Sequence, residues 1–246
     1  MPGSGARHLL MGDVTSTGRL SGEATGADDS APPTPTPTPT PVGRRPGPAQ
    51  LVVASTLLGV VALGGALLAF DPGENAVDSW GFTVFPRVFD SPFLGAVTDI
   101  GRAAVTFGVA VVVGALVWRR DRGRAIACPV GPALAIGLAE LLKVLVGRRF
   151  EGALCWPSGT AAAVAAVITM LVLVTPPTGR PMATLVGAVV MTLEVVTLVS
   201  FRWHYLSDAL GGVVLGVGCA LFVDAVVHRL GRPRRRRPSD LARPAI

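Results

Sequence analysis

Long apolar stretches follow one another along the chain from residue 49 onward, with short polar segments between them. A helix needs about 20 apolar residues to cross a bilayer, and these stretches are long enough. They are rich in Ala, Leu and Gly and lack the period-two alternation of strands, so they predict helices. We expect six membrane-spanning helices at about residues 49–70, 100–118, 125–147, 158–175, 183–201 and 207–227.

The two ends of the chain lack this pattern. Residues 1–48 show no apolar periodicity, and Thr alternates with Pro within residues 31–48. Such a segment favours polyproline II and cannot form a core. It does not resemble a secretory signal, because no basic start is followed by an apolar stretch. We therefore divide the chain into a disordered cytoplasmic tail at 1–48, a six-helix membrane domain at 49–228 and a basic cytoplasmic tail at 229–246.

The composition agrees with a membrane protein. Of the residues, 50% are hydrophobic and 15% are charged, whereas soluble domains carry about 25% charged residues. We therefore predict an all-α fold, a polytopic membrane bundle of about six transmembrane helices. Gly212 and Gly216 have the spacing of close helix contacts. The widely spaced Cys128, Cys155 and Cys219 indicate small buried residues rather than a disulfide framework or a metal site.

Charged residues divide between the two sides of the predicted helices. On one side, the loop 119–124 has four Arg against one Asp, and the segment from residue 229 has seven Arg against one Asp. On the other side, the loop 71–99 has five acidic residues against one Arg. The positive-inside rule therefore places both termini in the cytoplasm. The acidic loop also holds aromatic residues that fit either a segment in the outer interface or a plain loop: Trp80, Phe82, Phe85 and Phe89.

The first of three polar clusters on the extracytoplasmic side is the segment KVLVGRRFEG at residues 143–152. It begins with Lys143, the only Lys in the chain, and contains Arg148 and Arg149. With Arg202, these cations lie on the side that the positive-inside rule disfavours. Each one alone could be a side chain that snorkels from a helix end. Together they indicate a site for an anionic head group, phosphate above all.

The second cluster is the segment WPSGT at residues 156–160, where a helix is expected to start. Ser158 is a residue type that caps helices. The backbone N–H groups of Gly159 and Thr160 would then point out of the helix start and form an anion site. A capping turn without a ligand is the alternative interpretation of the same residues.

The third cluster is the segment SFRWHYLSD at residues 200–208. His204 and Asp208 are four residues apart, so on a helix they share a face. A carboxylate in this position can hold one imidazole nitrogen and leave the other free to attack or to move a proton. The other two His residues lie in the N-terminal tail and at the cytoplasmic end, so His204 is the only His available to this site.

The order of these clusters resembles that of the type 2 phosphatidic acid phosphatase superfamily, whose members are six-helix membrane phosphatases. The resemblance covers about residues 49–227. It implies that His204 is the nucleophile that forms a phosphohistidine and that Asp208 orients it. It implies no metal and no other cofactor. The phosphate-binding set that follows from it, with the neighbouring cations and the helix start, is Lys143, Arg148, Arg149, Ser158, Gly159, Thr160 and Arg202.

The chain departs from the family pattern in its first and third motifs. The family has an Arg seven residues after the Lys, where this chain has Phe150, so we favour Arg148 over Arg149 as the phosphate ligand. The family's third-motif Arg lies six residues before the His, where this chain has Leu198, whereas Arg202 lies only two residues before it.

The second motif departs at Thr160, which occupies the place of a His that is regarded as the general acid in the family. A hydroxyl is a poor acid near neutral pH. The substitution therefore indicates either a leaving group that needs little help, such as the phosphate expelled from a diphosphate, or a loss of activity. Glu151 and Tyr205 are the substitute donors that the sequence offers.

Taken together, these features predict an integral membrane phosphohydrolase. It would remove phosphate from a lipid phosphate or a polyprenyl diphosphate at the extracytoplasmic face of the cell membrane, with no nucleic acid partner and an oligomeric state that we do not predict. The alternative is a catalytically impaired relative that binds lipid phosphate as a scaffold or transporter. Glu140 and Glu194 lie within predicted helices, where carboxylates are costly. Glu140 can pair with Lys143, whereas the sequence offers no partner for Glu194.

Overall fold

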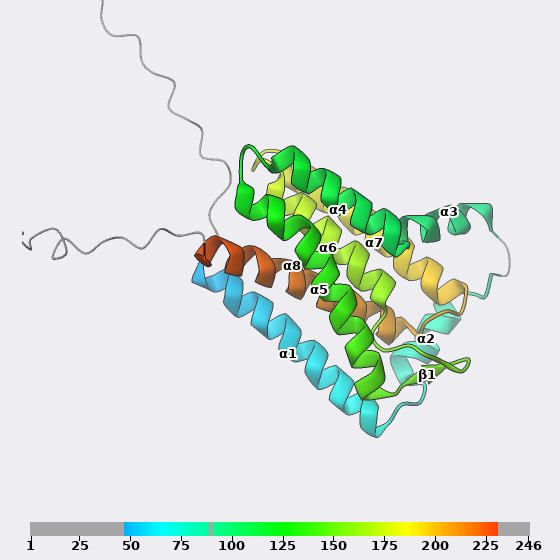
Figure 1. The fold of residues 1–246 in the computed structure, drawn as a ribbon. Coiled ribbons are helices and arrows are strands. Elements are labelled where there is room, and N and C mark those ends of the chain that lie inside the picture. Colours follow the sequence, from blue (N-terminus) through cyan, green and yellow to red (C-terminus); the bar gives the residue numbers. More distant parts are fainter. Residues whose placement is uncertain (1–46, 89–90, 231–246) are drawn as a thin grey trace, which may run out of the picture. The chain divides into compact units, whose positions relative to one another are not determined.

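The computed structural model describes residues 47–88 and 91–230 of the chain, so the predicted N-terminal tail and most of the basic C-terminal tail lie outside the described residues. The chain divides into two units, Met1–Thr40 and Pro41–Ile246, and all described residues belong to the second. Eight helices and one two-stranded hairpin occur in the described ranges (Figure 1). Their bounds are α1 Pro48–Phe70, α2 Ala76–Val84, α3 Pro92–Gly101, α4 Ala103–Val117, α5 Arg122–Val146, β1 Arg149–Phe150, β2 Ala153–Leu154, α6 Gly159–Val174, α7 Arg180–Ser200 and α8 Leu206–Leu230.

The predicted all-α membrane bundle is confirmed, because each of the six predicted apolar stretches forms a helix. Among the described residues, α1, α5, α7 and α8 are long and apolar enough to cross a membrane. Helices α3 and α4 are apolar enough only as a pair, and a bend of 56° between them fits either a broken fifth span or a re-entrant loop. Helix α6 has 16 residues, which is shorter than the ~20 that a span needs. It contacts α3, α4, α5, α7 and α8, so neighbouring helices cover much of its surface.

The acidic segment 71–99 contains two helices instead of a plain loop. Asn75 begins α2 with a capping box, in which its side chain accepts hydrogen bonds from the N–H groups of Val77 and Asp78. The Asp78 carboxylate accepts a hydrogen bond from the Asn75 N–H in return. Helix α3 ends at Gly101, and α4 starts two residues later in a new direction.

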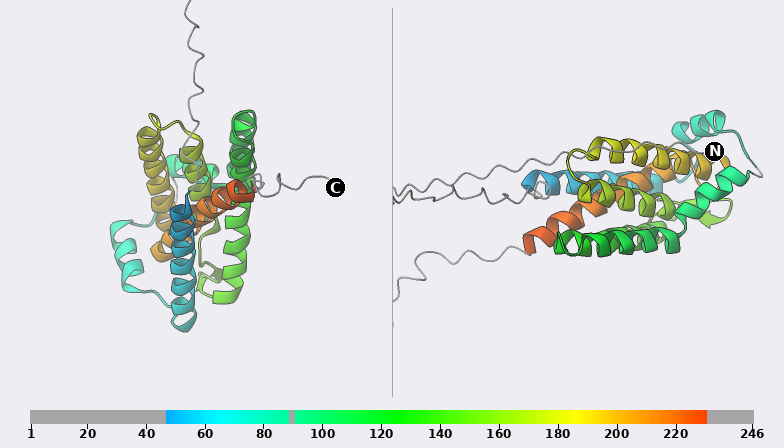
Figure 2. Two further views of the ribbon diagram at one scale, coloured as in Figure 1. Left: turned by 90° about the vertical axis from the view of Figure 1, so that its left-hand side faces the viewer. Right: turned by 90° about the horizontal axis from the view of Figure 1, so that it is seen from above.

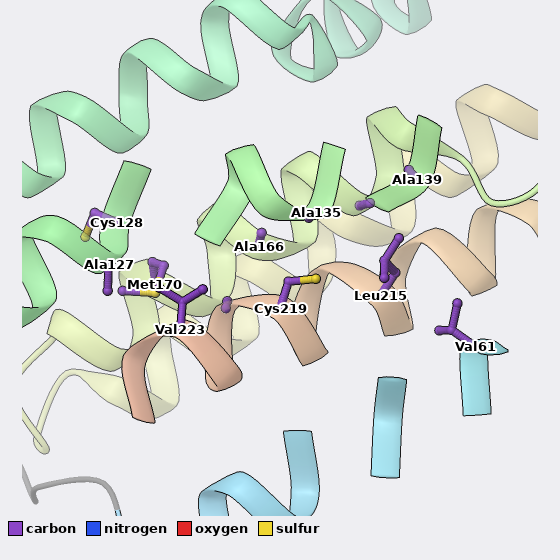
Figure 3. Packing of buried hydrophobic residues seen from close by; sticks show 12 residues of the cluster. Val61, Ala127, Cys128, Ala135, Ala139, Ala166, Met170, Leu215, Cys219 and Val223 are labelled. Atoms are coloured by element: carbon purple, nitrogen blue, oxygen red, sulfur yellow. The ribbon is translucent and has the colours of Figure 1, made fainter. Parts of the chain in front are cut away.

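The core lies where α5, α6 and α8 meet (Figures 1 and 2). Ala135, Ala166, Leu215 and Cys219 are among the buried residues of this cluster (Figure 3). Small residues allow the helices to approach closely, as the spacing of Gly212 and Gly216 predicted. A side chain on Gly212 would collide with the Ser158 carbonyl of α6, and one on Gly216 with the Ala162 carbonyl.

One end of the bundle carries the start of α1, the end of α8 and the loop between α4 and α5 (Figure 1). A polar cluster joins these elements. The buried Arg124 lies 3.4 Å from Asp224, Asp224 accepts a hydrogen bond from Gln50, and His228 lies 3.2 Å from Asp121. Burial alone would raise the pKa of Asp121, but the Arg124 N–H and His228 lower it overall. These contacts link α1, α5 and α8 at the end of the bundle that carries the Arg-rich loop between α4 and α5.

Candidate active site

The three predicted clusters meet at the other end of the bundle. The end of α5, the start of α6 and the turn between α7 and α8 lie there, together with α2 and the β1–β2 hairpin (Figures 1 and 2). A hydrogen bond from the Ser158 N–H to the Asp208 carbonyl, 3.0 Å long, links the second cluster directly to the third. Residues that are far apart in the sequence thus form one site.

The start of α6 has the capping geometry that the sequence predicted. Ser158 is the N-cap, is fully buried, and accepts a hydrogen bond from the Ala161 N–H at 3.4 Å. Gly159 and Thr160 follow as the first two helical residues, so their N–H groups belong to the set that a helix leaves without partners. This helix start can accept an anion.

His204 and Asp208 face each other, although only Asp208 lies in a helix. His204 belongs to the turn before α8, and its Nδ1 lies 3.8 Å from Asp208 Oδ2. This Nδ1 is buried and has no hydrogen-bond partner among the described residues. Asp208 Oδ2 also accepts a hydrogen bond from the Tyr205 N–H at 3.2 Å. The turn therefore holds the imidazole beside the carboxylate at a distance slightly longer than a hydrogen bond.

Arg148 is fully buried, and protein groups accept a hydrogen bond from every donor position of its guanidinium. It forms ion pairs with Asp78 and Asp208, each 2.6 Å long, and donates to Ser207 Oγ at 2.7 Å. The carbonyls of residues 72 and 73 accept its other N–H groups. Burial alone would lower the pKa of Arg148, but the pairs with Asp78 and Asp208 raise it overall. In this arrangement the Arg148 guanidinium binds Asp208, and none of its N–H groups is left to bind a phosphate.

Lys143 lies beside the start of α6. Its ammonium forms the predicted pair with Glu140, at 2.7 Å. A side-chain carbon on Gly159 would lie 3.8 Å from the Lys143 Nζ and 3.3 Å from a Glu140 oxygen. The cation is thus next to the backbone where an anion at this helix start would bind.

Arg149 and Arg202 lie at the edge of the site. Arg149 is exposed on β1 and donates to the Gly152 carbonyl at 2.8 Å. Arg202 has a positive φ of 57°, and its guanidinium lies 3.9 Å from the centre of the Phe82 ring. Its Nη1 is buried and has no hydrogen-bond partner in the described part of the chain. Of the predicted cations, Arg202 therefore has a buried donor that described residues do not use.

The two substitute proton donors that the sequence offered lie away from Thr160. Glu151 is in the turn of the hairpin, 3.6 Å from Arg87, with 58% of its side chain exposed. The Tyr205 ring packs against Phe150 and Arg148, and burial raises the pKa of its hydroxyl. Neither residue is among the described residues that line the pocket around Thr160.

That pocket has a volume of about 220 Å³ and lies beside the break between α3 and α4. It combines residues of α3, α4, α6 and α7 with one residue between α3 and α4 and one from the turn before α8: Thr98, Gly101, Arg102, Ala103, Thr160, Glu194 and Trp203. Sequence reasoning singled out Thr160 and Glu194 but did not connect them. It treated Asp78 only as one charge of an acidic loop, although the Asn75–Asp78 spacing is the signal of a capping box.

Comparisons with known proteins agree with the motifs. Residues 143–232 match the family model of the PAP2 superfamily, and no curated protein sequence matches the chain. The chain is similar in structure to the first transmembrane PAP2 type phosphatidylglycerolphosphate phosphatase from Bacillus subtilis, with a TM-score of 0.56 and 20% sequence identity. The alignment covers 72% of this chain and 98% of that one, and at this identity it shows the fold alone. The chain is thus a multi-pass membrane protein with the fold of a transmembrane PAP2-type phosphatase, and the resemblance that the three motifs predicted is confirmed.

Proposed function

We propose that this protein is an integral membrane phosphohydrolase that removes phosphate from a lipid phosphate or a polyprenyl diphosphate through a phosphohistidine intermediate. The observation that carries the proposal is the contact between His204 Nδ1 and Asp208 Oδ2, 3.8 Å apart, beside the capped start of α6. A nucleophile, a group that orients it and an anion site are thereby close together.

His204 is the nucleophile in this mechanism. Asp208 faces Nδ1 and favours the tautomer in which Nδ1 carries the proton, which leaves Nε2 free to attack phosphorus. A nitrogen–phosphorus bond forms while the bond from phosphorus to the leaving oxygen breaks. Water then attacks the phosphohistidine, and inorganic phosphate and free His204 are released. Asp208 stabilises the imidazolium that carries positive charge during the first step.

The phosphate binds at the start of α6. The N–H groups of Gly159 and Thr160 donate to its oxygens, and Ser158 holds this turn in place. The Lys143 ammonium lies close enough to neutralise part of its charge. Arg202 supplies a further donor through its unused Nη1. Arg149 contacts the lipid head group at the edge of the site, since its side chain is exposed on β1.

Arg148 has a different role in this proposal. Because Asp78, Asp208 and backbone carbonyls accept its hydrogen bonds, we assign it as a positioning residue for Asp208. It fixes one oxygen of Asp208 and thereby directs the other toward His204.

The active site faces the extracytoplasmic side of the cell membrane. The Arg-rich loop between α4 and α5 and the end of α8 lie at the end of the bundle opposite the site. The acidic segment between α1 and α4 lies at the site end. The positive-inside rule supports this orientation and the cytoplasmic position of both termini.

The test is phosphate release by the purified protein in detergent micelles that contain lipid phosphates and diphosphates. Wild type should release phosphate, His204→Ala should not, and labelled substrate should leave phosphate on His204. Asp208→Asn should slow turnover by roughly 10²–10⁴-fold with little change in substrate binding, since the carboxylate acts through the imidazole. A His204→Ala variant with full activity would contradict the mechanism.

The presence of Thr160 favours one second candidate, a protein that binds lipid phosphate without cleaving it. It predicts that wild type binds the lipids but releases no phosphate, and that Lys143→Ala weakens the binding. The same purified samples distinguish the two candidates.

A further inference from the structure

We propose that Glu194 is the proton donor for the leaving group, in the place where the family pattern has a histidine. The proposal rests on the proposed phosphohydrolase function and adds a catalytic residue that lies outside the three sequence motifs. Four features of the structure carry it: the burial of Glu194, its lack of a partner among the described residues, its position beside Thr160 and the position of their pocket next to the turn before α8.

Glu194 lies on α7, six residues before the end of the helix at Ser200. Only 1% of the residue is exposed, and Oε1 has no hydrogen-bond partner among the described residues. An ionised carboxylate without a partner is costly to bury, in a protein and in a membrane alike. A protonated carboxyl group costs less, and it is also the form that can give a proton away. Glu140, the other Glu within a predicted helix, instead pairs with Lys143.

The side chains of Glu194 and Thr160 both lie beside Gly101. Both line the 220 Å³ pocket at the break between α3 and α4. A methyl group placed on Gly101 would lie 2.5 Å from Thr160 Cγ2 and 2.6 Å from Glu194 Oε1. Gly101 therefore permits α3 to approach α6 and α7 more closely than any larger residue would allow. The carboxyl group occupies the neighbourhood in which a histidine side chain at position 160 would lie.

The pocket also borders the turn that carries the nucleophile. Trp203 lines it and directly precedes His204 in the turn before α8. The backbone of Thr160 belongs to the proposed phosphate site at the start of α6, where Lys143 lies near Gly159. A phosphate bound at this helix start can direct its leaving oxygen into the pocket. That oxygen would then lie next to the Glu194 carboxyl group. The volume is below the ~300–1,000 Å³ of sites that enclose a whole ligand, so the pocket accommodates the end of a head group rather than a lipid.

The proton balance of the reaction fits one carboxyl group. When His204 Nε2 bonds to phosphorus, the bond from phosphorus to the ester oxygen breaks and its electron pair remains on that oxygen. The Glu194 carboxyl group gives its proton to this oxygen, so the alcohol leaves neutral and Glu194 becomes a carboxylate. In the second step Glu194 takes a proton from the water that attacks the phosphohistidine. Phosphate leaves, and both residues return to their starting states.

This role changes what Thr160 implies for the substrate. The sequence indicated either a leaving group that needs little help, such as the phosphate expelled from a diphosphate, or a loss of activity, because Thr160 is a poor acid. With Glu194 present, a lipid monophosphate has a proton donor as well. Removal of the carboxyl group should then reveal the diphosphate preference that Thr160 alone would produce.

The experiment compares farnesyl phosphate with farnesyl diphosphate, which share one lipid chain and differ in the basicity of the leaving group. Wild type, Glu194→Gln, His204→Ala and Thr192→Val are purified in the same micelles. Thr192 is exposed on α7, and its hydroxyl bonds only within that helix, so Thr192→Val controls for a polar substitution on α7. Glu194→Gln should lower kcat/KM for the monophosphate by roughly 10²–10⁴-fold. It should leave kcat/KM for the diphosphate nearly unchanged, because this ratio reports the steps up to loss of the leaving group and not the later hydrolysis of the phosphohistidine. Retained diphosphate hydrolysis also shows that the variant is folded.

Five results overturn the proposal, and they are distinguishable. If Glu194→Gln keeps full activity on the monophosphate, or loses both activities equally while His204→Ala is inactive, Glu194 is not the donor but the phosphatase mechanism stands. If wild type releases no phosphate, or His204→Ala stays active, the proposed function fails and this inference fails with it. A second variant provides a further check, because Thr160→His in the Glu194→Gln background should restore monophosphate hydrolysis. Failure of this rescue in a protein that still hydrolyses the diphosphate contradicts the assigned position of the donor.

Discussion

Arg148 and Asp208 form an ion pair 2.6 Å long between two side chains that are fully buried. The pair joins Arg148, two residues after the end of α5, to the first turn of α8 across 60 positions of the sequence. Asp78 of α2 binds the same guanidinium at 2.6 Å and also accepts a hydrogen bond from the Ser207 N–H. A helix from the acidic segment thereby stabilises the carboxylate that faces His204.

Arg148→Lys should therefore act on turnover rather than on substrate affinity. A lysine has one ammonium group and cannot reach Asp78, Asp208 and the two carbonyls together. Asp208 would lose its fixed orientation, so kcat should fall while KM changes little. The buried carboxylates of Asp78 and Asp208 would lose some of their hydrogen bonds to the guanidinium, so a lower unfolding temperature should accompany the kinetic effect.

Arg149→Gln is the matched variant for this measurement, because Arg149 is adjacent but exposed. It should leave the unfolding temperature unchanged and raise KM if Arg149 contacts the head group. A large rise in KM for Arg148→Lys at constant kcat would instead identify Arg148 as a phosphate ligand.

The orientation of the bundle predicts which positions are accessible from outside the cell. In a background that lacks Cys128, Cys155 and Cys219, Glu151→Cys should react with an impermeant thiol reagent in intact cells. Arg122→Cys, at the exposed start of α5, should react only after the cells are permeabilised. Glu151 is well suited to this test because its side chain is 58% exposed, whereas Trp156 in the neighbouring cluster is buried. The reverse labelling pattern would place the site in the cytoplasm.

Gly101→Ala should damage the Thr160–Glu194 pocket. The added methyl group would overlap both side chains, and overpacking of this kind costs typically about 1–3 kcal/mol. We expect a lower unfolding temperature and a larger loss of activity on farnesyl phosphate than on farnesyl diphosphate. Gly95→Ala on the same helix is the control, since a methyl group there meets nothing within 4 Å. Equal behaviour of the two variants would mean that the close approach at Gly101 is absent.

Gly216→Ala should separate α8 from α6. Its methyl group would collide with the Ala162 carbonyl, which belongs to the backbone and cannot rotate away. The free energy of unfolding in detergent should fall by about 1–3 kcal/mol relative to wild type, and the unfolding temperature should fall with it. Gly137→Ala on α5 has open space around the new methyl group and should not have this effect. Thermal unfolding of the two variants side by side is the measurement.

Local features of the sequence determined most of the helices and part of the site. Apolar length and composition predicted where six of the helices lie, because an apolar stretch of this kind is a property of consecutive residues and not of their neighbours in space. The cap at Ser158 and the pair of Lys143 with Glu140 were also predictable, since each involves residues within one turn of a helix. The Gly212–Gly216 spacing predicted a close helix contact for the same local reason.

Only the tertiary structure decided which distant residues share the site. His204 lies in a turn and not on a helix with Asp208, so packing of this turn, rather than helical periodicity, brings the two together. Arg148 meets Asp78 over 70 positions of sequence because α2 folds back against α8. Glu194 and Thr160 line one pocket, and both lie close to Gly101 because this residue has no side chain to keep α3 away from α6 and α7. Such contacts depend on how side-chain volumes fit between helices, and a one-dimensional pattern of apolar and polar residues does not contain that information.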